Sequence, residues 1–244
     1  MGRALVERER FDYDRNMDVE PSIAALGAMI AVPARANILA ALFDGRALTA
    51  SELAIAARVS PQTTSSHLAK LVDARLLVVE RHGRHRYYRL AGPAVAEALE
   101  PLTHISPHRP VPGRGKSAEL QNLREARMCY DHLAGRLGVL LTEAMVSRNL
   151  LKALGREYEV TPRGSKFCKE LGIELDKLRS QRRVFARQCL DWSERKPHLA
   201  GVLGAAIAQS LIDRGWLTRS SRGRNVILTD AGQSALQDRL KLKI

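Results

Sequence analysis

The stretch TASELAIAARVSPQTTSSHLAKLVDARLLVVERHGRHRYYRL, residues 49–90, decides the fold of the first half of this chain. Thr49 and Glu52 have the spacing of a capping box, in which the Thr oxygen accepts a backbone N–H and the Glu side chain reaches back to the cap residue. A short helix with one apolar face follows and ends at the turn 58–60. Ser60 and Pro61 are then residue types typical of an N-cap and a first helical position. The spacing predicts two helices joined by a tight turn.

The second of these helices has an apolar side and a polar side. Thr64, Leu68, Leu71 and Val72 share the side that we expect to pack inward. The opposite side carries no acidic residue before Asp73, which suits contact with base edges and phosphates. We therefore predict DNA contacts from its polar residues, with a bidentate Gln–adenine pair among them and phosphate contact by the lysine. These candidates are Gln62, Thr63, Ser66, His67 at the edge of the face, and Lys70.

A basic β-hairpin is predicted directly after the second helix, with strands at about 76–80 and 86–90. Gly83 supplies the positive φ that a tight turn favours. Arg81, Arg84 and Arg86, together with two histidines, crowd cations around this turn. Phosphate or minor-groove contact is one interpretation and a solvated charged loop is the other; an adjacent helix-turn-helix favours DNA contact.

The charge of the whole chain also points to a polyanionic partner. The 244 residues include 39 Lys+Arg against 26 Asp+Glu, a formal net charge of +13. Such a field favours nucleic acid or an anionic membrane surface, although a merely basic soluble protein remains possible on charge alone. The longest apolar run, residues 199–208, is far shorter than the roughly 20 residues of a membrane-spanning helix, so we expect no membrane partner. Three widely spaced cysteines and an N-terminus without an apolar run predict a reduced, cytoplasmic protein.

Composition divides the chain into four parts. Residues 1–18 are expected to form a mobile arm, 19–106 a DNA-binding domain, 107–117 a Pro/Gly-rich linker and 118–244 a regulatory domain. In the last part we predict helices at 119–137 and 141–154, then a strand leading into a helix capped by Thr161. A similar pattern recurs at 226–232, which suggests a second winged-helix-like unit. The expected fold class is mainly α with small β-hairpin wings (α+β).

Over residues 23–90 the sequence resembles the ArsR/SmtB family of winged-helix transcription regulators. The resemblance runs through VPARANIL (32–39), LTASELAIAARVSPQTTSSHLAKLVDARLL (48–77) and RHGRHRYYRL (81–90). It implies a homodimer built on the flanking helices, whose two second helices enter successive major grooves of a near-palindromic operator. It also implies a repressor that a small effector releases.

The chain departs from this family at both of its familiar metal sites. Arsenic-type members carry paired cysteines in the helix matched by residues 51–57, where this chain has no thiol. Zinc-type members carry Asp/His ligands on the helix after the wing, where this chain has only Glu97, Glu100 and His104 without the paired spacing. The resemblance therefore predicts DNA binding with no family metal site, and no cofactor is required.

Two cysteine-containing segments in the second half are candidates for effector sensing. Cys129 and His132 are three residues apart, so on the predicted helix they would share a face and could ligate a soft metal. With Cys189 and His198 they would form a thiolate/imidazole site or a redox-responsive thiol pair. The alternative is an inert role, because cysteine usually behaves as a small buried hydrophobe, as we expect for Cys168.

A run of four arginines at 179–187 is predicted on a helix, either as a second nucleic-acid contact or as a solvated face. The chain lacks a Gly-rich phosphate loop, a nucleophile elbow and a metalloprotease helix, so no motif supports an enzyme. The sequence thus favours a sequence-specific regulator of double-stranded DNA. The alternatives are a sequence-tolerant architectural binder, a redox- or metal-responsive regulator using Cys129 and Cys189, and an enzymatic or metal-storage role for the second half.

Overall fold

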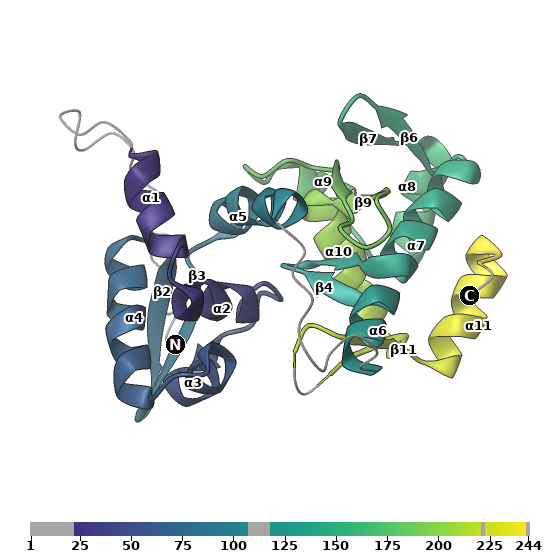
Figure 1. The fold of residues 1–244 in the computed structure, drawn as a ribbon. Helices are drawn as coiled ribbons and strands as arrows, with labels where there is room; N and C mark the ends of the chain where they lie inside the picture. Colours follow the sequence, from purple (N-terminus) through teal and green to yellow (C-terminus); the bar gives the residue numbers. More distant parts are fainter. Residues whose placement is uncertain (1–21, 107–117, 221–222, 243–244) are drawn as a thin grey trace, which may run out of the picture.

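The computed structural model of the chain describes residues 22–106, 118–220 and 223–242. The arm and the linker predicted from the sequence therefore lie outside the described residues. Figure 1 shows the two halves side by side, with the last helix of the first half, α5, reaching toward the second half. Among the described residues no single helix is long and apolar enough to cross a membrane; α1 and α2 reach that length and composition only together, across an 86° bend.

The N-terminal half is a small helical domain with a three-stranded antiparallel sheet in the order β1-β3-β2. Its core lies where α2, α3 and α4 meet the sheet, and Ile38, Leu42, Leu53 and Leu71 are completely buried there. The elements are α1 (Ile23–Ile30), α2 (Pro33–Ala41), β1 (Leu48–Thr49), α3 (Ala50–Ala57), α4 (Pro61–Asp73), β2 (Leu77–His82), β3 (His85–Leu90) and α5 (Pro93–Ile105).

The helix starts in this domain follow the capping chemistry read from the sequence. The Thr49 hydroxyl accepts the backbone N–H of Glu52, and the Glu52 carboxylate accepts the backbone N–H of Thr49 at 2.7 Å. This contact with Thr49 lowers the pKa of Glu52. Ser60 caps α4 with Pro61 at the first turn, and Arg58 ends α3 with a positive φ of 57°. The predicted helix-turn-helix is confirmed.

The C-terminal half alternates short hairpins with helices. It contains one four-stranded antiparallel sheet, β6-β7-β8-β9, and two hairpins, β4-β5 and β10-β11. The elements are α6 (Ala118–Glu125), β4 (Arg127–Cys129), β5 (His132–Ala134), α7 (Gly135–Ser147), β6 (Leu151–Leu154), β7 (Glu157–Val160), α8 (Pro162–Glu170), α9 (Leu175–Arg179), β8 (Arg187–Leu190), β9 (Pro197–Ala200), α10 (Gly201–Asp213), β10 (Leu217–Arg219), β11 (Val226–Leu228) and α11 (Asp230–Leu240).

The two long helices predicted at 119–137 and 141–154 are confirmed only in part, because α6 ends at Glu125 and α7 ends at Ser147. Tyr130 and Gly135 adopt positive φ values of 57° and 79°, so the chain leaves α6, forms the β4-β5 hairpin and only then enters α7. Asn149, at φ 56°, ends α7 before strand β6. All six residues of β4 and β5 are buried, and a strand buried on both faces lacks the alternation that distinguishes it from a helix in sequence.

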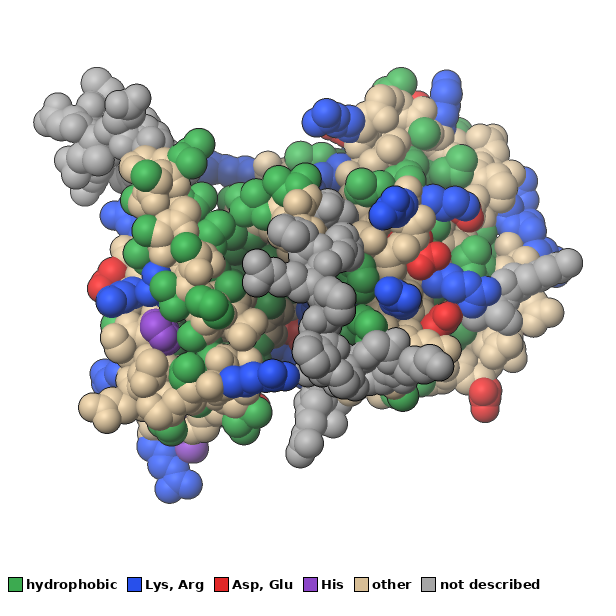
Figure 2. Space-filling model, viewed as in Figure 1, with side chains coloured by type: hydrophobic (Ala, Val, Ile, Leu, Met, Phe, Trp, Pro, Cys, Tyr) green, Lys and Arg blue, Asp and Glu red, His purple; other side chains and the backbone are tan. Residues whose placement is uncertain are grey.

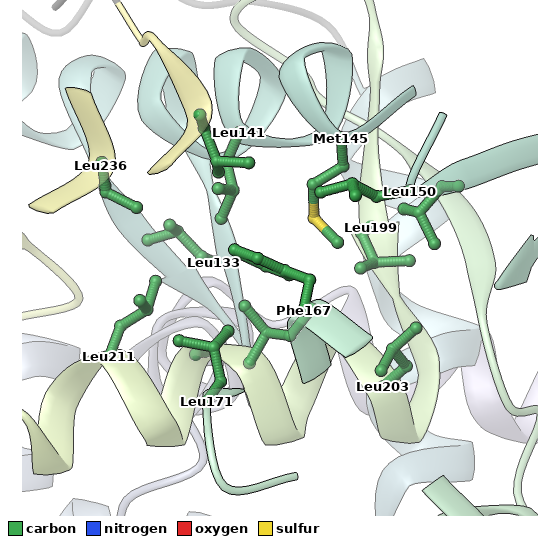
Figure 3. Close-up of a cluster of buried hydrophobic side chains, with 14 of the residues drawn as sticks. Leu133, Leu141, Met145, Leu150, Phe167, Leu171, Leu199, Leu203, Leu211 and Leu236 are labelled. Atoms are coloured by element: carbon green, nitrogen blue, oxygen red, sulfur yellow. The ribbon is translucent and has the colours of Figure 1, made fainter. Parts of the chain in front are cut away.

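The core of the C-terminal half gathers around Phe167 of α8. Figure 3 shows Leu133, Leu141 and Leu211 among the apolar side chains that surround it, supplied by elements far apart in sequence. The order helix, strand, strand, Thr-capped helix occurs twice, once as α7 to α8 and once as α10 to α11. Thr161 and Thr229 cap the final helices, each accepting a glycine N–H at 3.0 Å. The α+β class is confirmed; a winged-helix origin for this half remains a hypothesis.

Candidate nucleic-acid interface and a buried sulfur and imidazole cluster

The polar face of α4 is open to solvent. Gln62, Ser66 and Lys70 are exposed, whereas Thr64 and Leu68 on the other side are at most 1% exposed. The helix is thus anchored by its apolar side and presents the residue types predicted for base and phosphate contact.

Two of the predicted contact residues are constrained. The Thr63 hydroxyl lies 2.8 Å from the Ser60 hydroxyl and so takes part in the helix cap. His67 is half-buried at the edge of the face. Burial and then the nearby Arg35 lower its pKa, which favours the neutral imidazole.

The wing brings like charges together. In the β2-β3 register Arg81 lies opposite Arg86, and His82 lies opposite His85, with the turn at Gly83 (φ 58°). These residues and Arg84 are exposed. Figure 2 shows Lys/Arg and His side chains at the lower end of the N-terminal domain, where this hairpin ends. Like charges in direct cross-strand pairs destabilise a hairpin, so the Arg81–Arg86 pair does not stabilise the tip.

Nearer the sheet, the wing is neutralised and anchored. Arg89 donates twice to one carboxylate oxygen of Glu80, at 2.7 and 2.9 Å. Tyr88 is 8% exposed and packs in the core, while Tyr87 is half-buried on the other face, as strand alternation predicts. Within the hairpin, as the structure describes it, Arg89 is paired with an acidic residue and the arginines at the tip are not.

A second constellation lies in the C-terminal half. The side chains of Cys129, His132, Cys189 and His198 are all buried, and their nearest ligand atoms lie within 4.8 Å of one another. The two imidazole rings are 5.1 Å apart between centroids, tilted by 30°. The four candidates from the sequence are thus brought together.

The reason given from the sequence for their proximity is wrong, however. Cys129 and His132 are cross-strand partners in the β4-β5 hairpin rather than neighbours on a helix face. Cys189 and His198 are cross-strand partners in β8-β9. Each hairpin therefore supplies one sulfur and one imidazole.

A sequence repeat could have predicted this arrangement. Residues 126–138 read ARMCYDHLAGRLG, and residues 186–204 read ARQCLDWSERKPHLAGVLG, so one Ala-Arg-x-Cys-x-Asp…His-Leu-Ala-Gly-x-Leu-Gly pattern occurs twice. The two copies pack reciprocally. A Cβ on Gly138 would lie 3.7 Å from the His198 Cβ, and one on Gly204 would lie 3.3 Å from the His132 Cβ. Each helix start thus covers the histidine of the other copy.

An aspartate accompanies each histidine. Asp131 Oδ1 lies 3.3 Å from His132 Nδ1, and Asp191 Oδ2 lies 3.5 Å from His198 Nδ1. Burial alone would lower the pKa of His132, but the Asp131 carboxylate and the Cys189 sulfur raise it to about 9. The Nε2 atoms of both histidines are buried without a hydrogen-bond partner among the described residues.

Glu100 of α5 is the residue that sequence reasoning missed. The Cys129 thiol donates to Glu100 Oε1, and Cys189 Sγ lies 3.3 Å from Glu100 Oε2. Burial, followed by Cys189, raises the pKa of Glu100. Burial also raises the pKa of Cys129, whereas Cys129 and the two imidazoles hold that of Cys189 well below its usual range. The sequence did not indicate this role for Glu100, because Glu100 lacks the spacing of the family metal ligands. Its partners Cys129 and Cys189 also lie in the other half of the chain.

The halves make further contacts around this cluster. The backbone N–H of Tyr130 donates to the Phe43 carbonyl at 2.5 Å, and Arg219 donates to the Asp44 carbonyl at 3.2 Å. Arg187 of β8 lies 3.5 Å from Glu97, one turn before Glu100 on α5. The sulfur and imidazole cluster therefore sits at the junction with the DNA-binding domain.

Two other sequence hypotheses have different outcomes. The arginine run 179–187 is not a helix: α9 ends at Arg179, and β8 begins at Arg187. Arg183 pairs with Asp131 at 2.6 Å, and Arg179 stacks on Phe185, so much of this charge is used internally. The prediction for Cys168 is confirmed, because it is fully buried and burial raises its pKa to about 11.

The capped helix pair followed by a basic hairpin defines a winged helix-turn-helix DNA-binding domain of the ArsR type. Residues 30–80 match a family model described as a helix-turn-helix domain. The chain is 43% identical over 226 residues to the uncharacterized HTH-type transcriptional regulator YdfF of Bacillus subtilis (strain 168), covering 93% of this chain and all of that protein. The chain belongs to this family of HTH-type transcriptional regulators, and it is a regulator rather than an enzyme.

Solved structures that resemble the chain cover about a third of it. NolR from Sinorhizobium fredii is 28% identical over 34% of this chain and 81% of its own, with a TM-score of 0.31. The cadmium metal-sensor CMTR from Mycobacterium tuberculosis is 32% identical over 36% of this chain and 96% of its own, with a TM-score of 0.30.

Proposed function

We propose that this regulator binds a near-palindromic operator as a homodimer and represses transcription in the cytoplasm until a small effector releases it. The observation that carries the proposal is the wing tip, where arginine faces arginine and histidine faces histidine beside the acid-free face of α4. Both surfaces belong to one domain, so a single docking can place α4 against base edges and the wing against phosphates.

The exposed apolar residues of the flanking helices support a homodimer. Helix α1 has no buried residue, and Ile23 and Leu26 are 87% and 37% exposed. Ile105, at the end of α5, is 80% exposed. A second copy of the chain would cover these side chains and place two recognition helices one helical turn apart on DNA.

Replacing Gln62 with alanine is expected to change which sequences the protein prefers. A bidentate Gln–adenine pair contributes about 1–3 kcal/mol of discrimination, so the preference at one operator position should weaken by roughly 5- to 150-fold. In-vitro selection from genomic fragments, followed by affinity measurements at fixed salt, tests this. Gln121→Ala, at an exposed site on α6, is the control that should leave the preference unchanged.

Two outcomes of the selection experiment would contradict the proposal. Equal affinity of the unaltered protein for selected and random DNA would instead indicate a sequence-tolerant architectural binder. An unchanged preference in the Gln62→Ala variant would show that α4 does not enter the major groove with this face.

Combining Ile23→Glu with Ile105→Glu is expected to weaken self-association by more than tenfold. Burying an unpaired carboxylate in an interface costs several kcal/mol, whereas both sites tolerate a charge in the monomer because they are exposed. Analytical ultracentrifugation would measure the dimer–monomer equilibrium. Ile227→Glu, at a 58% exposed site in β11, is the matched control. If the control weakened association equally, the interface would lie elsewhere.

A further inference from the structure

The sulfur and imidazole cluster belongs to the C-terminal half, and the proposed DNA contacts do not use it. We propose that Cys129, His132, Cys189 and His198 bind one divalent metal ion of the zinc class, and that Glu100 couples this site to the DNA-binding domain. The coupling rests on the proposed function; the metal site itself does not.

The donor set fits a zinc-class ion. Two sulfurs and two imidazole nitrogens form a Cys2His2 set, which is typical of closed tetrahedral sites. With metal–ligand distances of about 2.0–2.3 Å, the ligand atoms of a tetrahedral site are roughly 3.3–3.8 Å apart. The four side chains have their ligand atoms within 4.8 Å of one another, so contractions of at most about 1.0–1.5 Å would complete the site. Thiolate ligands also disfavour magnesium and calcium, which take oxygen donors.

Within the described part of the chain, the Nε2 atoms of the two imidazoles lack hydrogen-bond partners and are therefore available to a metal ion. His132 and His198 are 3% and 1% exposed, and the Nε2 atom of each has no hydrogen bond. A buried polar atom without a partner carries a desolvation cost that a metal–nitrogen bond would offset. At the opposite ring nitrogen, His132 Nδ1 is hydrogen-bonded to Asp131 at 3.3 Å, whereas His198 Nδ1 lies 3.5 Å from Asp191 without a hydrogen bond. A carboxylate behind the imidazole fixes the ring and directs the other nitrogen to the metal.

The ion would join the two copies of the internal repeat. Each copy contributes one cysteine and one histidine, from β4-β5 and from β8-β9. The two cysteines share a small buried cluster with Ala134 and Ala200, both fully buried and both small. A metal ion bound by all four side chains would link the two short hairpins.

Glu100 extends the site to α5. Its contacts with the two sulfurs depend on protons shared between carboxylate and sulfur. When both sulfurs bind a metal as thiolates, the Cys129 thiol releases to solvent the proton that it donates to Glu100, so this contact is lost. Helix α5 begins at Pro93, directly after wing strand β3 ends at Leu90. Loss of this Glu100 contact therefore weakens the attachment of the C-terminal half to the helix that follows the wing.

Cobalt binding to the reduced full-length protein tests the metal site. We expect one Co²⁺ per chain, with the sulfur-to-cobalt charge-transfer absorption of thiolate ligands, and displacement by Zn²⁺. Cys129→Ser and Cys189→Ser should each weaken binding by more than about 100-fold, beyond the roughly 10- to 100-fold loss typical of residues that orient ligands. Cys168→Ala, in the α8 core, should retain binding.

A variant that leaves all four ligands in place separates loss of metal binding from misfolding. Asp131 is 25% exposed, and Asp131→Asn keeps its shape, so we expect a folded protein by circular dichroism with Co²⁺ affinity about 10- to 100-fold weaker. The proposal would be overturned if Co²⁺ did not bind or bound without thiolate absorption. It would also be overturned if a Cys129–Cys189 disulfide formed and no metal bound.

The coupling is tested by operator affinity with and without Zn²⁺. We expect Zn²⁺ to change the affinity of the unaltered protein by at least about fivefold, the lower range of allosteric coupling. Glu100→Gln should still bind Co²⁺ but lose this response, whereas Glu97→Gln, one turn away on α5, should keep it. Operator binding without any metal binding would defeat this inference and leave the proposed function standing. Metal binding without selective DNA binding would defeat the proposed function and leave the metal site standing.

Discussion

Replacing Asp191 with alanine is expected to lower the free energy of unfolding of the C-terminal half by about 3–5 kcal/mol, the cost of removing one partner from a buried ion pair. Asp191 is fully buried and lies 2.8 Å from Arg127, which is 2% exposed. The same carboxylate accepts the backbone N–H groups of Gly135 at 2.7 Å and Ser193 at 2.8 Å. The substitution leaves the Arg127 guanidinium buried without its counter-charge.

Denaturant titration of the full chain would measure this loss. Both tryptophans, Trp192 and Trp216, lie in the C-terminal half, so their fluorescence reports on its unfolding. Glu125→Ala is the control, because its pair with Arg136 is about half exposed and is expected to contribute about 0–1 kcal/mol. If the two variants lost similar stability, the buried pair would not anchor the first repeat to the second.

Replacing Arg81, Arg84 and Arg86 together with alanine is expected to weaken binding to all DNA sequences alike. Each lost phosphate contact reduces the slope of log affinity against log salt by about 0.9, so the slope should fall by roughly 3 per wing. Arg84→Ala alone should remove about one third of that effect. The protein should stay folded, since the change removes the cross-strand repulsion between Arg81 and Arg86.

Binding isotherms at several salt concentrations separate this effect from the general charge of the protein. The matched control removes three exposed positive charges from α8, as Arg163→Ala, Lys166→Ala and Lys169→Ala. We expect the control to keep nearly the full slope. An equal loss in both variants would mean that the net charge of +13, and not the wing, holds the DNA.

The DNA-binding half was predictable because its signals are local. The capping box at Thr49, the Ser60-Pro61 start of α4 and the Gly83 turn each act within a few residues. Local rules of this kind predicted the helices, the wing and the exposed face of α4. In the C-terminal half the same rules failed at Tyr130, because tyrosine rarely adopts the positive φ of 57° that turns the chain there.

The sulfur and imidazole cluster shows the other limit of sequence reasoning. The sequence singled out its four side chains by chemistry, but with a helical spacing that the chain does not use. The repeat of Ala-Arg-x-Cys-x-Asp would have supplied the right pairing, because equivalent segments of a duplicated unit tend to pack as equivalents.

By itself the sequence determined the helix-turn-helix, its basic wing and the identity of the candidate ligands, since these depend on capping, periodicity and side-chain chemistry. Only the tertiary structure decided that two hairpins some 60 residues apart bring their cysteines and histidines together, and that Glu100 of α5 contacts both sulfurs. The reason is physical: such contacts are fixed by packing between distant segments, and no local propensity encodes the partner of a buried group.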